Sequence, residues 1–447
     1  MTDKLLRGRI LTFMDEPLDG EASGGCFSYF EDGGLLVRNG RVAALDDFGR
    51  IVAGEGAGVE IVDHRPDLIM PGFIDTHIHF PQMQVVGSYA GQLLEWLNKY
   101  TFVEEQRFVD EAHGARIASC FFDELVRQGT TTAVAYCSVH KGSAEAFFAE
   151  AERRNMRMIA GKVMMDRNAP RGLLDTPQAG YDDTKALIGK WHGRGRQLYA
   201  ISPRFAITST PEQLEMSRAL VSEHPDCYLQ THLSENHGEI ETVARLFPWS
   251  RDYTDVYERY GLLGRRSLFG HCIHLSDREA AVLGGSGSVA VFCPTSNLFL
   301  GSGLFNLDRL RSFDPPVHNA IATDIGGGTS YSMLRTLDEG YKVLNLQGQR
   351  YHPLRSFYQA TLGNARALSL EGTIGSFLPG AEADCIVLEA RATPAMRLRM
   401  ETVTSLSEEL FLLQTIGDDR AVAEVYVAGE AAKGRRGSLT CTSLRRT

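Results

Sequence analysis

The sequence predicts an α/β fold in which a closed (β/α)8, or TIM, barrel carries a small β-sandwich module built from both chain ends. Between residues 69 and 327, short apolar runs return at regular intervals, and each is followed by a charged stretch of helical period. Eight such units in roughly 260 residues suit a closed barrel, for which about 250 residues is typical. The two ends of the chain instead carry short strand-like runs between Gly and Asp turns.

Eight apolar runs are the candidate barrel strands: Ile69–His79, Thr131–Cys137, Met158–Met165, Leu198–Ala206, Cys227–His232, Ser267–His274, Val289–Cys293 and Ala320–Asp324. The stretches between them, such as Glu104–Val126, Thr210–Glu223 and Ser276–Leu283, repeat apolar residues every three or four positions, which indicates helices. An open doubly wound sheet is the structural alternative. It is disfavoured because no GxGxxG turn follows an early strand.

The chain is expected to contain two domains. Six short strand-like runs lie outside the barrel region: Lys4–Phe13, Gly34–Arg38, Gly40–Leu45, Gly58–Val62, Ala383–Leu388 and Ala421–Val427. We expect residues 1–68 and 376–447 to form one composite β-sandwich domain. Residues 69–375 are expected to form the barrel with the metal site, which a helix over Gly348–Leu368 completes.

The composition excludes several classes of protein. A chain of 447 residues with 43% hydrophobic and 23% charged residues is long enough for a large core. A net charge of -10, with no cluster of Lys, Arg and aromatic residues, argues against nucleic-acid binding. No apolar stretch approaches the roughly 18 residues of a membrane span, and the first twenty residues do not resemble a signal peptide. The eight cysteines contain no CxxC pair, which indicates reduced thiols in a cytoplasmic protein.

Five polar residues lie at or near the ends of predicted strands. His77 and His79 form an HxH pair at the end of the first run, and residues two apart on a strand point to the same face. His232 ends the fifth run, His271 lies in the sixth, and Asp324 ends the eighth. Barrel enzymes place their chemistry at the carboxyl ends of the strands. Three imidazoles and a carboxylate suit Zn²⁺, although Fe²⁺ accepts the same ligands.

Several longer stretches resemble the amidohydrolase superfamily of metal-dependent hydrolases, and the resemblance covers nearly the whole chain. They are PGFIDTHIHFPQ, LLEWLNKYTFVEEQRF, GTTTAVAYC, GKVMMDRN, SPRFAIT, THLSEN, CPTSNLFLGSG and ATDIGGGTSYSML. The segment Leu93–Phe108 is the most discriminating, because it is similar to the members that deaminate guanine and is not shared by the superfamily in general. The resemblance therefore implies hydrolytic deamination of guanine at C2 to xanthine and ammonia, a step of purine catabolism.

The resemblance also implies roles for individual residues. One zinc ion per chain would be bound by His77, His79, His232 and Asp324. Glu235 would transfer protons, and the purine would contact Gln82, Arg204 and Phe205. Trp96 is expected to pack over the base, with filling of the core as the alternative. The guanine base is the expected small-molecule partner, and the chain is expected to form a homodimer.

These residues predict a mechanism. A metal held by neutral imidazoles and one carboxylate lowers the pKa of bound water towards roughly 7, which yields hydroxide. Attack of hydroxide at C2 moves electron density to N3, and Glu235, three residues after His232, is placed to protonate N3. Asp324 would take the proton from the attacking water. His271 would hydrogen-bond the hydroxide and the forming C–O group.

The same residues allow some other functions and argue against others. A deaminase or dechlorinase of another nitrogen heterocycle, such as a pterin, an adenosine derivative or a triazine, would share every metal residue. A non-catalytic scaffold predicts lost ligands, and none is missing. A binuclear hydrolase needs a lysine at the end of the fourth strand, where this chain has Arg204. The cytidine-deaminase type of zinc site needs HxE and PCxxC; His237-Gly238-Glu239 matches the first, but without any CxxC we interpret this match as accidental.

Overall fold

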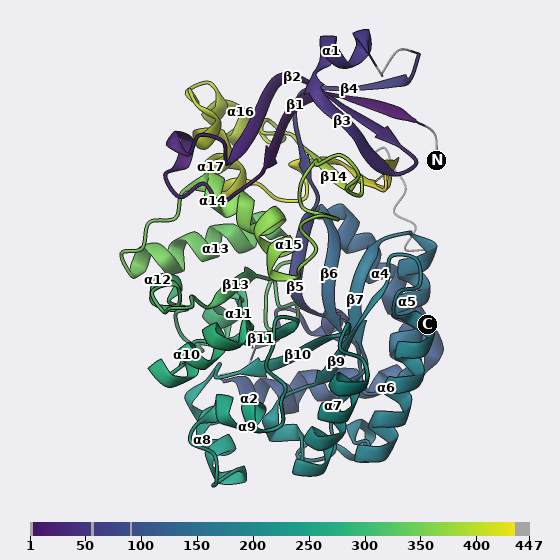
Figure 1. Cartoon of the computed structure of the whole chain (residues 1–447), viewed down its shortest axis with the longest axis vertical. Coiled ribbons are helices and arrows are strands. Elements are labelled where there is room, and N and C mark those ends of the chain that lie inside the picture. The colour runs from purple at the N-terminus through teal and green to yellow at the C-terminus, as the bar shows by residue number, and fades with distance from the viewer. Residues whose placement is uncertain (1–2, 55–57, 90–91, 434–447) are drawn as a thin grey trace.

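A computed structural model describes residues 3–54, 58–89 and 92–433. The barrel lies in the lower part of Figure 1, and a sheet module lies above it. Residues 434–447, which belong to the predicted composite domain, lie outside the described residues. Among the residues that are described, no helix is both long and apolar enough to cross a membrane.

The barrel sheet has eight parallel strands in sequence order, with one short strand beside them. They are β5 (Phe73–His79), β6 (Thr130–Tyr136), β7 (Arg157–Gly161), β9 (Leu198–Pro203), β10 (Tyr228–Leu233), β11 (Ser267–His271), β12 (Val289–Phe292) and β13 (His318–Ile321), and β8 (Val163–Met164) pairs with β9. Backbone hydrogen bonds from Asp324 to His77 (2.9 Å) and from His79 to Ile325 (3.0 Å) join the first strand to the segment after the last. The predicted fold class is confirmed.

The first predicted barrel strand is in fact two strands in different sheets. Ile69 belongs to β4 (Glu60–Pro71) of the upper module, and β5 begins at Phe73. The chain changes sheets at Gly72, where a Cβ would overlap the Thr131 side chain. The apolar run continues through this change because both strands are buried, so hydrophobicity alone gave no boundary.

The upper module is a seven-stranded mixed sheet built from both ends of the described chain. Its strands, in spatial order, are β16 (Glu430–Ala431), β15 (Val422–Val427), β14 (Cys385–Leu388), β4, β1 (Lys4–Phe13), β2 (Phe27–Arg38) and β3 (Arg41–Asp47). β1 runs parallel to β4, whereas β14 and β2 run antiparallel to their neighbours. The amino-terminal and carboxyl-terminal strands meet at the β14–β4 pair, so the two ends of the chain stabilise each other.

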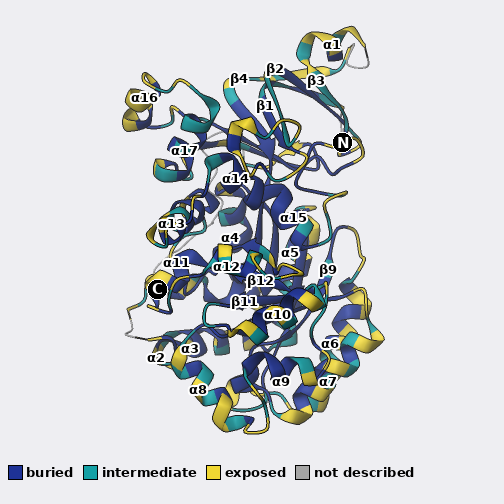
Figure 2. Cartoon of the chain, turned by 60° about the vertical axis from the view of Figure 1, so that its left-hand side comes forward, coloured by how far each residue is buried: buried dark blue, intermediate teal, exposed yellow. Residues whose placement is uncertain are grey.

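Helices surround the barrel and cover part of the module. In chain order they are α1 (Phe48–Ala53), α2 (Leu93–Trp96), α3 (Phe102–Glu105), α4 (Glu111–Arg127), α5 (Lys141–Arg153), α6 (Pro177–Trp191), α7 (Pro211–Glu223), α8 (His237–Leu246), α9 (Tyr253–Arg259), α10 (Asp277–Ser286), α11 (Pro294–Phe299), α12 (Leu307–Arg311), α13 (Met333–Leu346), α14 (Pro353–Tyr358), α15 (Asn364–Ala367), α16 (Pro394–Met400) and α17 (Leu406–Ile416). Figure 2 shows buried strands inside, with exposed residues on the outer turns of α6 and α7.

Capping residues explain where several helices begin. The side chains of Thr210 and Ser276 accept backbone N–H groups three residues on, at the starts of α7 and α10. The helix predicted over Glu104–Val126 is interrupted, because Asp110 adopts an extended backbone and caps α4. The single helix predicted near 348–368 is divided into α14, a π-helical turn at Gln359–Gly363, and α15.

Candidate active site

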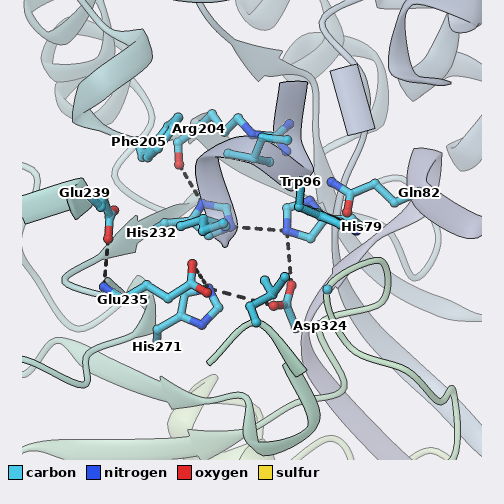
Figure 3. Close-up of a pocket in the computed structure, with 14 residues that line it drawn as sticks. His79, Gln82, Trp96, Arg204, Phe205, His232, Glu235, Glu239, His271 and Asp324 are labelled. Atoms are coloured by element: carbon cyan, nitrogen blue, oxygen red, sulfur yellow. Dashed lines mark hydrogen bonds and ion pairs between the residues drawn. The ribbon is translucent and has the colours of Figure 1, made fainter. Parts of the chain in front are cut away.

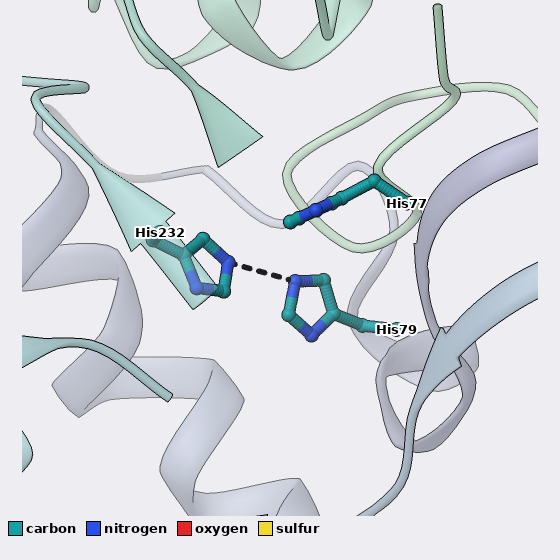
Figure 4. A group of neighbouring side chains, drawn as sticks. All are labelled: His77, His79 and His232. Carbon is teal, nitrogen blue, oxygen red and sulfur yellow. Dashed lines mark hydrogen bonds between the residues drawn. The ribbon is translucent and has the colours of Figure 1, made fainter. Parts of the chain in front are cut away.

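The five residues predicted at strand ends converge at the carboxyl end of the barrel. His79 Nε2 lies 3.2 Å from His232 Nε2, and Figure 4 shows His77 beside this pair. Asp324 Oδ1 lies 3.3 Å from the Nε2 atoms of both His77 and His79. These possible metal ligands form two overlapping groups, one of His77, His79 and His232 and the other of His77, His271 and Asp324. Within each group the possible ligand atoms lie within 4.8 Å of one another.

Local backbone irregularities aim these side chains. The register between β5 and β6 shifts between Asp75 and Ile78, a bulge that turns the end of β5 next to His77. Gly270 on β11 leaves room for the His77 ring, since a Cβ there would lie 2.6 Å from His77 Cε1. His271 and Asp324 have φ angles of 72° and 51°. Such left-handed backbone is costly for residues other than glycine and is concentrated at functional sites.

The buried Asp75 holds the end of β5 in place through hydrogen bonds, a role that the sequence did not indicate. Its carboxylate accepts the backbone N–H of Thr323 (3.1 Å) and of His77 (3.3 Å), and also the Thr323 hydroxyl. Burial raises the pKa of Asp75 to about 6 against these hydrogen bonds. Asp75 therefore ties the first strand of the barrel to the segment that carries Asp324.

The donor set fits a divalent cation. Burial lowers the pKa of His79 to about 4 and that of His232 well below its ordinary value, so both imidazoles are neutral. His232 Nδ1 lies 2.7 Å from the Arg204 carbonyl oxygen and donates a hydrogen bond to it, so the lone pair of Nε2 is available to a metal ion. His77 Nε2 and His79 Nδ1 are buried without a hydrogen-bond partner. Although burial opposes ionisation, the neighbouring histidines hold the pKa of Asp324 well below its usual range.

Glu235 lies beside this group, just after β10. Its Oε1 accepts the Ser302 hydroxyl (2.8 Å), and its Oε2 lies 3.3 Å from His271 Nε2. Burial, together with the negative charge of Asp324, raises the pKa of Glu235 to about 8. At neutral pH this carboxyl group therefore carries a proton close to the histidine cluster.

Glu239, which we interpreted as part of an accidental motif, holds Glu235 in place. Its Oε2 accepts the backbone N–H of Glu235 (2.8 Å) and of Asn236 (3.2 Å), and Tyr253 donates to its Oε1 (2.9 Å). Asn236 and Glu239 form a capping box at the start of α8. The Asn-x-x-Glu spacing was the sequence signal for this role.

A cavity opens beside the cluster. All six residues predicted to contact substrate line it: Gln82, Trp96, Arg204, Phe205, Glu235 and His271. Figure 3 shows Glu235 and His271 on one side, with Arg204 and Trp96 on the other. The buried Trp96 Nε1 has no hydrogen-bond partner.

One further acidic residue stands behind the cavity wall. Glu105, at the end of α3, accepts hydrogen bonds from Gln82 Nε2 (2.9 Å) and from Arg204 Nη1 (2.8 and 2.9 Å). It is 1% exposed. The sequence placed Glu105 in the discriminating Leu93–Phe108 segment but gave no reason to choose it over the adjacent Glu104.

Comparison with known proteins gives the family. Residues 68–432 match the profile of the Amidohydrolase family. The chain belongs to the amidohydrolase family. It is 47% identical over 428 residues to the guanine deaminase of Escherichia coli (strain K12), an alignment that covers 96% of this chain and 97% of that protein.

Solved amidohydrolase structures agree with this assignment. The E. coli guanine deaminase structure superposes with a TM-score of 0.93 at 46% identity, covering 97% of this chain and 100% of the other. The structure of guanine deaminase from C. acetobutylicum with bound guanine in the active site has a TM-score of 0.84 at 27% identity, covering 96% and 100%. The predicted family is confirmed, and this amidohydrolase is a hydrolase whose site suits a divalent metal.

Proposed function

We propose that this amidohydrolase deaminates guanine at C2 by hydrolysis, giving xanthine and ammonia. The observation that carries the proposal is Glu235, buried beside the histidine–aspartate cluster, in a cavity whose far wall holds Arg204 and Gln82. The 47% identity to a guanine deaminase and the likeness to a structure with guanine in its active site support the choice of substrate.

We further propose that one zinc ion is bound by His77, His79, His232 and Asp324, with Fe²⁺ as the alternative ion. The imidazoles of His79 and His232, which burial keeps neutral, and the ionised carboxylate of Asp324 support this ligand set. When bound, such an ion lowers the pKa of a water ligand towards roughly 7 and so supplies the nucleophile.

Two side chains divide the proton transfers, and a third orients the attacking water. Asp324, held ionised, accepts the proton of the attacking water. Glu235 delivers its proton to N3 of the ring, and its carboxylate then takes the proton of the new C2 hydroxyl group and passes it to the amino group, which leaves as ammonia. The proton that Asp324 accepted from water returns Glu235 to its protonated state. His271 directs Nδ1 to Asn297 Oδ1 (2.9 Å), which leaves Nε2 facing Glu235 and Asp324, where it orients the attacking water.

The remaining wall of the cavity binds the base. Arg204 offers only hydrogen-bond donors and suits the O6 acceptor of guanine, and Gln82 lines the same cavity. Phe205 and Trp96 supply aromatic surface for the ring, and the unpartnered Trp96 Nε1 is an additional donor.

The test is ammonia release from a panel of purines, pterins, triazines and pyrimidines, with metal content measured on the same protein sample. We expect guanine to be the preferred substrate and one metal to be present per chain. Faster turnover of a pterin or a triazine would assign the protein to another heterocycle. Absence of turnover in fully metal-loaded protein would favour the scaffold hypothesis.

A homodimeric state and a cytoplasmic location also stay predictions. The first comes from the resemblance to the family alone, and the second is supported by eight widely spaced cysteines, which suit a reducing compartment. Sedimentation equilibrium of the purified protein measures the first, and fractionation of the source cells measures the second.

A further inference from the structure

Glu105 lies at the centre of a buried network that forms the back of the cavity wall. The network joins three separate elements: the 3-10 turn Phe80–Val85 with Gln82, the end of α3 with Glu105, and the segment after β9 with Arg204. The Ser138 hydroxyl donates to the Glu105 carbonyl oxygen (3.0 Å), which fixes the backbone of Glu105 to the end of β6. Glu105 itself does not line the cavity, so any effect on substrate passes through Gln82 and Arg204.

The Glu105 carboxylate determines the orientation of the Gln82 side-chain amide. A carboxylate only accepts hydrogen bonds, so the Gln82 atom that faces Glu105 is the donor Nε2. The Gln82 carbonyl oxygen is then turned towards the loop after Asp324. Gly326 in that loop leaves room for it, because a Cβ there would overlap Gln82 Oε1. Gln82 lines the cavity, so this oxygen is the acceptor that its side chain can offer to a bound base.

The same carboxylate fixes the Arg204 guanidinium. Among the described residues, the Arg204 side chain donates hydrogen bonds to Glu105 alone, and only through Nη1. The guanidinium carbon lies 5.4 Å from the centre of the Phe102 ring, which supports the planar group from one side. Nε and Nη2 remain as donors on a side chain that is 3% exposed and borders the cavity.

We propose that Glu105 is a positioning residue that sets the hydrogen-bonding polarity of the base-binding wall, with Gln82 as acceptor and Arg204 as donor. The wall then selects a ring edge in which an N–H group stands beside a carbonyl group. The N1–H and C6=O of guanine form such an edge. The inference rests on the proposed function and extends it, since it assigns substrate selectivity to a residue outside the cavity.

Replacing Glu105 with glutamine changes the hydrogen-bonding groups of the side chain while it keeps the side chain's shape. The new amide at position 105 still accepts from Arg204 through its oxygen, but its nitrogen now faces Gln82, which favours inversion of the Gln82 amide so that a donor points into the cavity. In the exchanged double variant Gln82→Glu with Glu105→Gln, the carboxylate at position 82 accepts from the amide at position 105 and again presents an acceptor. A purely structural role for Glu105 predicts no such recovery.

The probes are guanine and 2,6-diaminopurine, which keeps the amino group at C2 but has an acceptor at N1 and a donor at C6. For each protein, kcat and KM are measured separately for both compounds, with zinc content and melting temperature recorded. We expect Glu105→Gln to reduce the guanine preference in kcat/KM by at least about tenfold, mainly through KM, as for an unpaired buried hydrogen-bonding group. We expect the double variant to regain at least half of the lost preference on a logarithmic scale.

The matched control is Glu104→Gln. Glu104 is the adjacent carboxylate on the same helix, but it contacts Arg107 and His113 instead of the cavity wall. Its variant should keep the wild-type preference. An unchanged preference in Glu105→Gln, or a double variant no closer to wild type than the single one, would overturn the inference. If the single variant does not fold, the double variant carries the test, and loss of its guanine preference overturns the inference.

Failure of the inference and failure of the proposed function give different results. If wild-type protein releases no ammonia from guanine, the proposed function fails before any variant is compared. If the wild type prefers guanine and the preference is independent of residue 105, the function stands and only the role of Glu105 is wrong.

Discussion

The two ends of the barrel both bury charged side chains, but only one end pairs them fully. At the amino end, Glu382 accepts hydrogen bonds from Arg157 (Nε, 2.7 Å) and Arg196 (Nε, 2.9 Å). Asp384 accepts from Arg196 and from the backbone N–H of Ala428 (2.7 Å). These contacts join the barrel to the upper sheet, and the arginines hold the pKa of Glu382 below its ordinary value although burial opposes this.

At the carboxyl end the polar groups are gathered without complete pairing. His77 Nε2 and His79 Nδ1 are buried without a hydrogen-bond partner, although Asp324 Oδ1 lies 3.3 Å from His77 Nε2, and Glu235 lies near this second acidic group. Such an arrangement costs folding free energy unless a ligand satisfies it. The difference between the ends shows where the molecule is stabilised and where it reacts: paired charges mark the join between the two sheets, and shifted, unpaired groups mark the site.

The largest expected effect comes from removing a metal ligand. In His77→Ala, the remaining side chains cannot close a four-ligand site, so bound metal and guanine turnover should both be abolished while the upper sheet stays folded. Metal analysis, ammonia release and circular dichroism on one sample check this. Full metal occupancy in the variant would remove His77 from the ligand set.

Glu235→Gln tests the proton donor at the same end. The amide keeps the shape but carries no transferable proton, so kcat should fall by about 10² to 10⁴ while zinc and substrate binding persist. Because burial raises the pKa of Glu235 to about 8, the protonated donor is present below that pH. Wild-type kcat should therefore fall as pH rises through about 8, and the variant should lose this dependence. A near-normal rate in Glu235→Gln would exclude Glu235 from proton transfer.

A substitution at the amino end should have the opposite signature. Glu382→Gln removes the charge that two buried arginines share, so the free energy of unfolding should fall by about 3 to 5 kcal/mol, measured by urea denaturation. The kcat/KM of the folded protein for guanine should not change. The control is Glu152→Gln, whose partner Arg194 is exposed, and its effect should stay within about 1 kcal/mol. If Glu382→Gln lost activity without losing stability, the amino end of the barrel would not be the stabilising end.

The smallest expected effect concerns the substrate wall. Arg204→Met removes the donor for O6, so the preference for guanine over 2,6-diaminopurine should fall by at least about tenfold, chiefly through slower guanine turnover. The measurement is kcat/KM for both compounds in both proteins. An unchanged ratio would mean that Arg204 does not read position 6 of the ring.

The sequence predicted most of what depends on local periodicity. His77 and His79 alternate on one strand, His232 and His271 follow at the spacing of barrel strands, and the structure brings all of them to one place with Asp324. The regular apolar runs likewise predicted the barrel, because buried parallel strands are nearly continuous hydrophobic segments.

What the sequence did not predict depends on contacts between distant segments. Glu105 and Glu104 are adjacent and chemically identical in the sequence, and only the packing of α3 against Gln82 and Arg204 distinguishes them. The boundary at Gly72 was missed because burial is continuous on both sides of it. Ion pairs such as Arg157–Glu382 join residues 225 positions apart, which no local pattern encodes.

Metal reconstitution measures whether one metal ion at the carboxyl end of the barrel supports guanine hydrolysis. Metal is removed from the wild-type protein with a chelator, Zn²⁺ is returned in measured portions, and ammonia release from guanine is followed at each step. We expect no activity in the metal-free protein, then a linear rise with added Zn²⁺ and a plateau at one equivalent per chain. Activity without metal, or a plateau at two equivalents, would contradict this expectation.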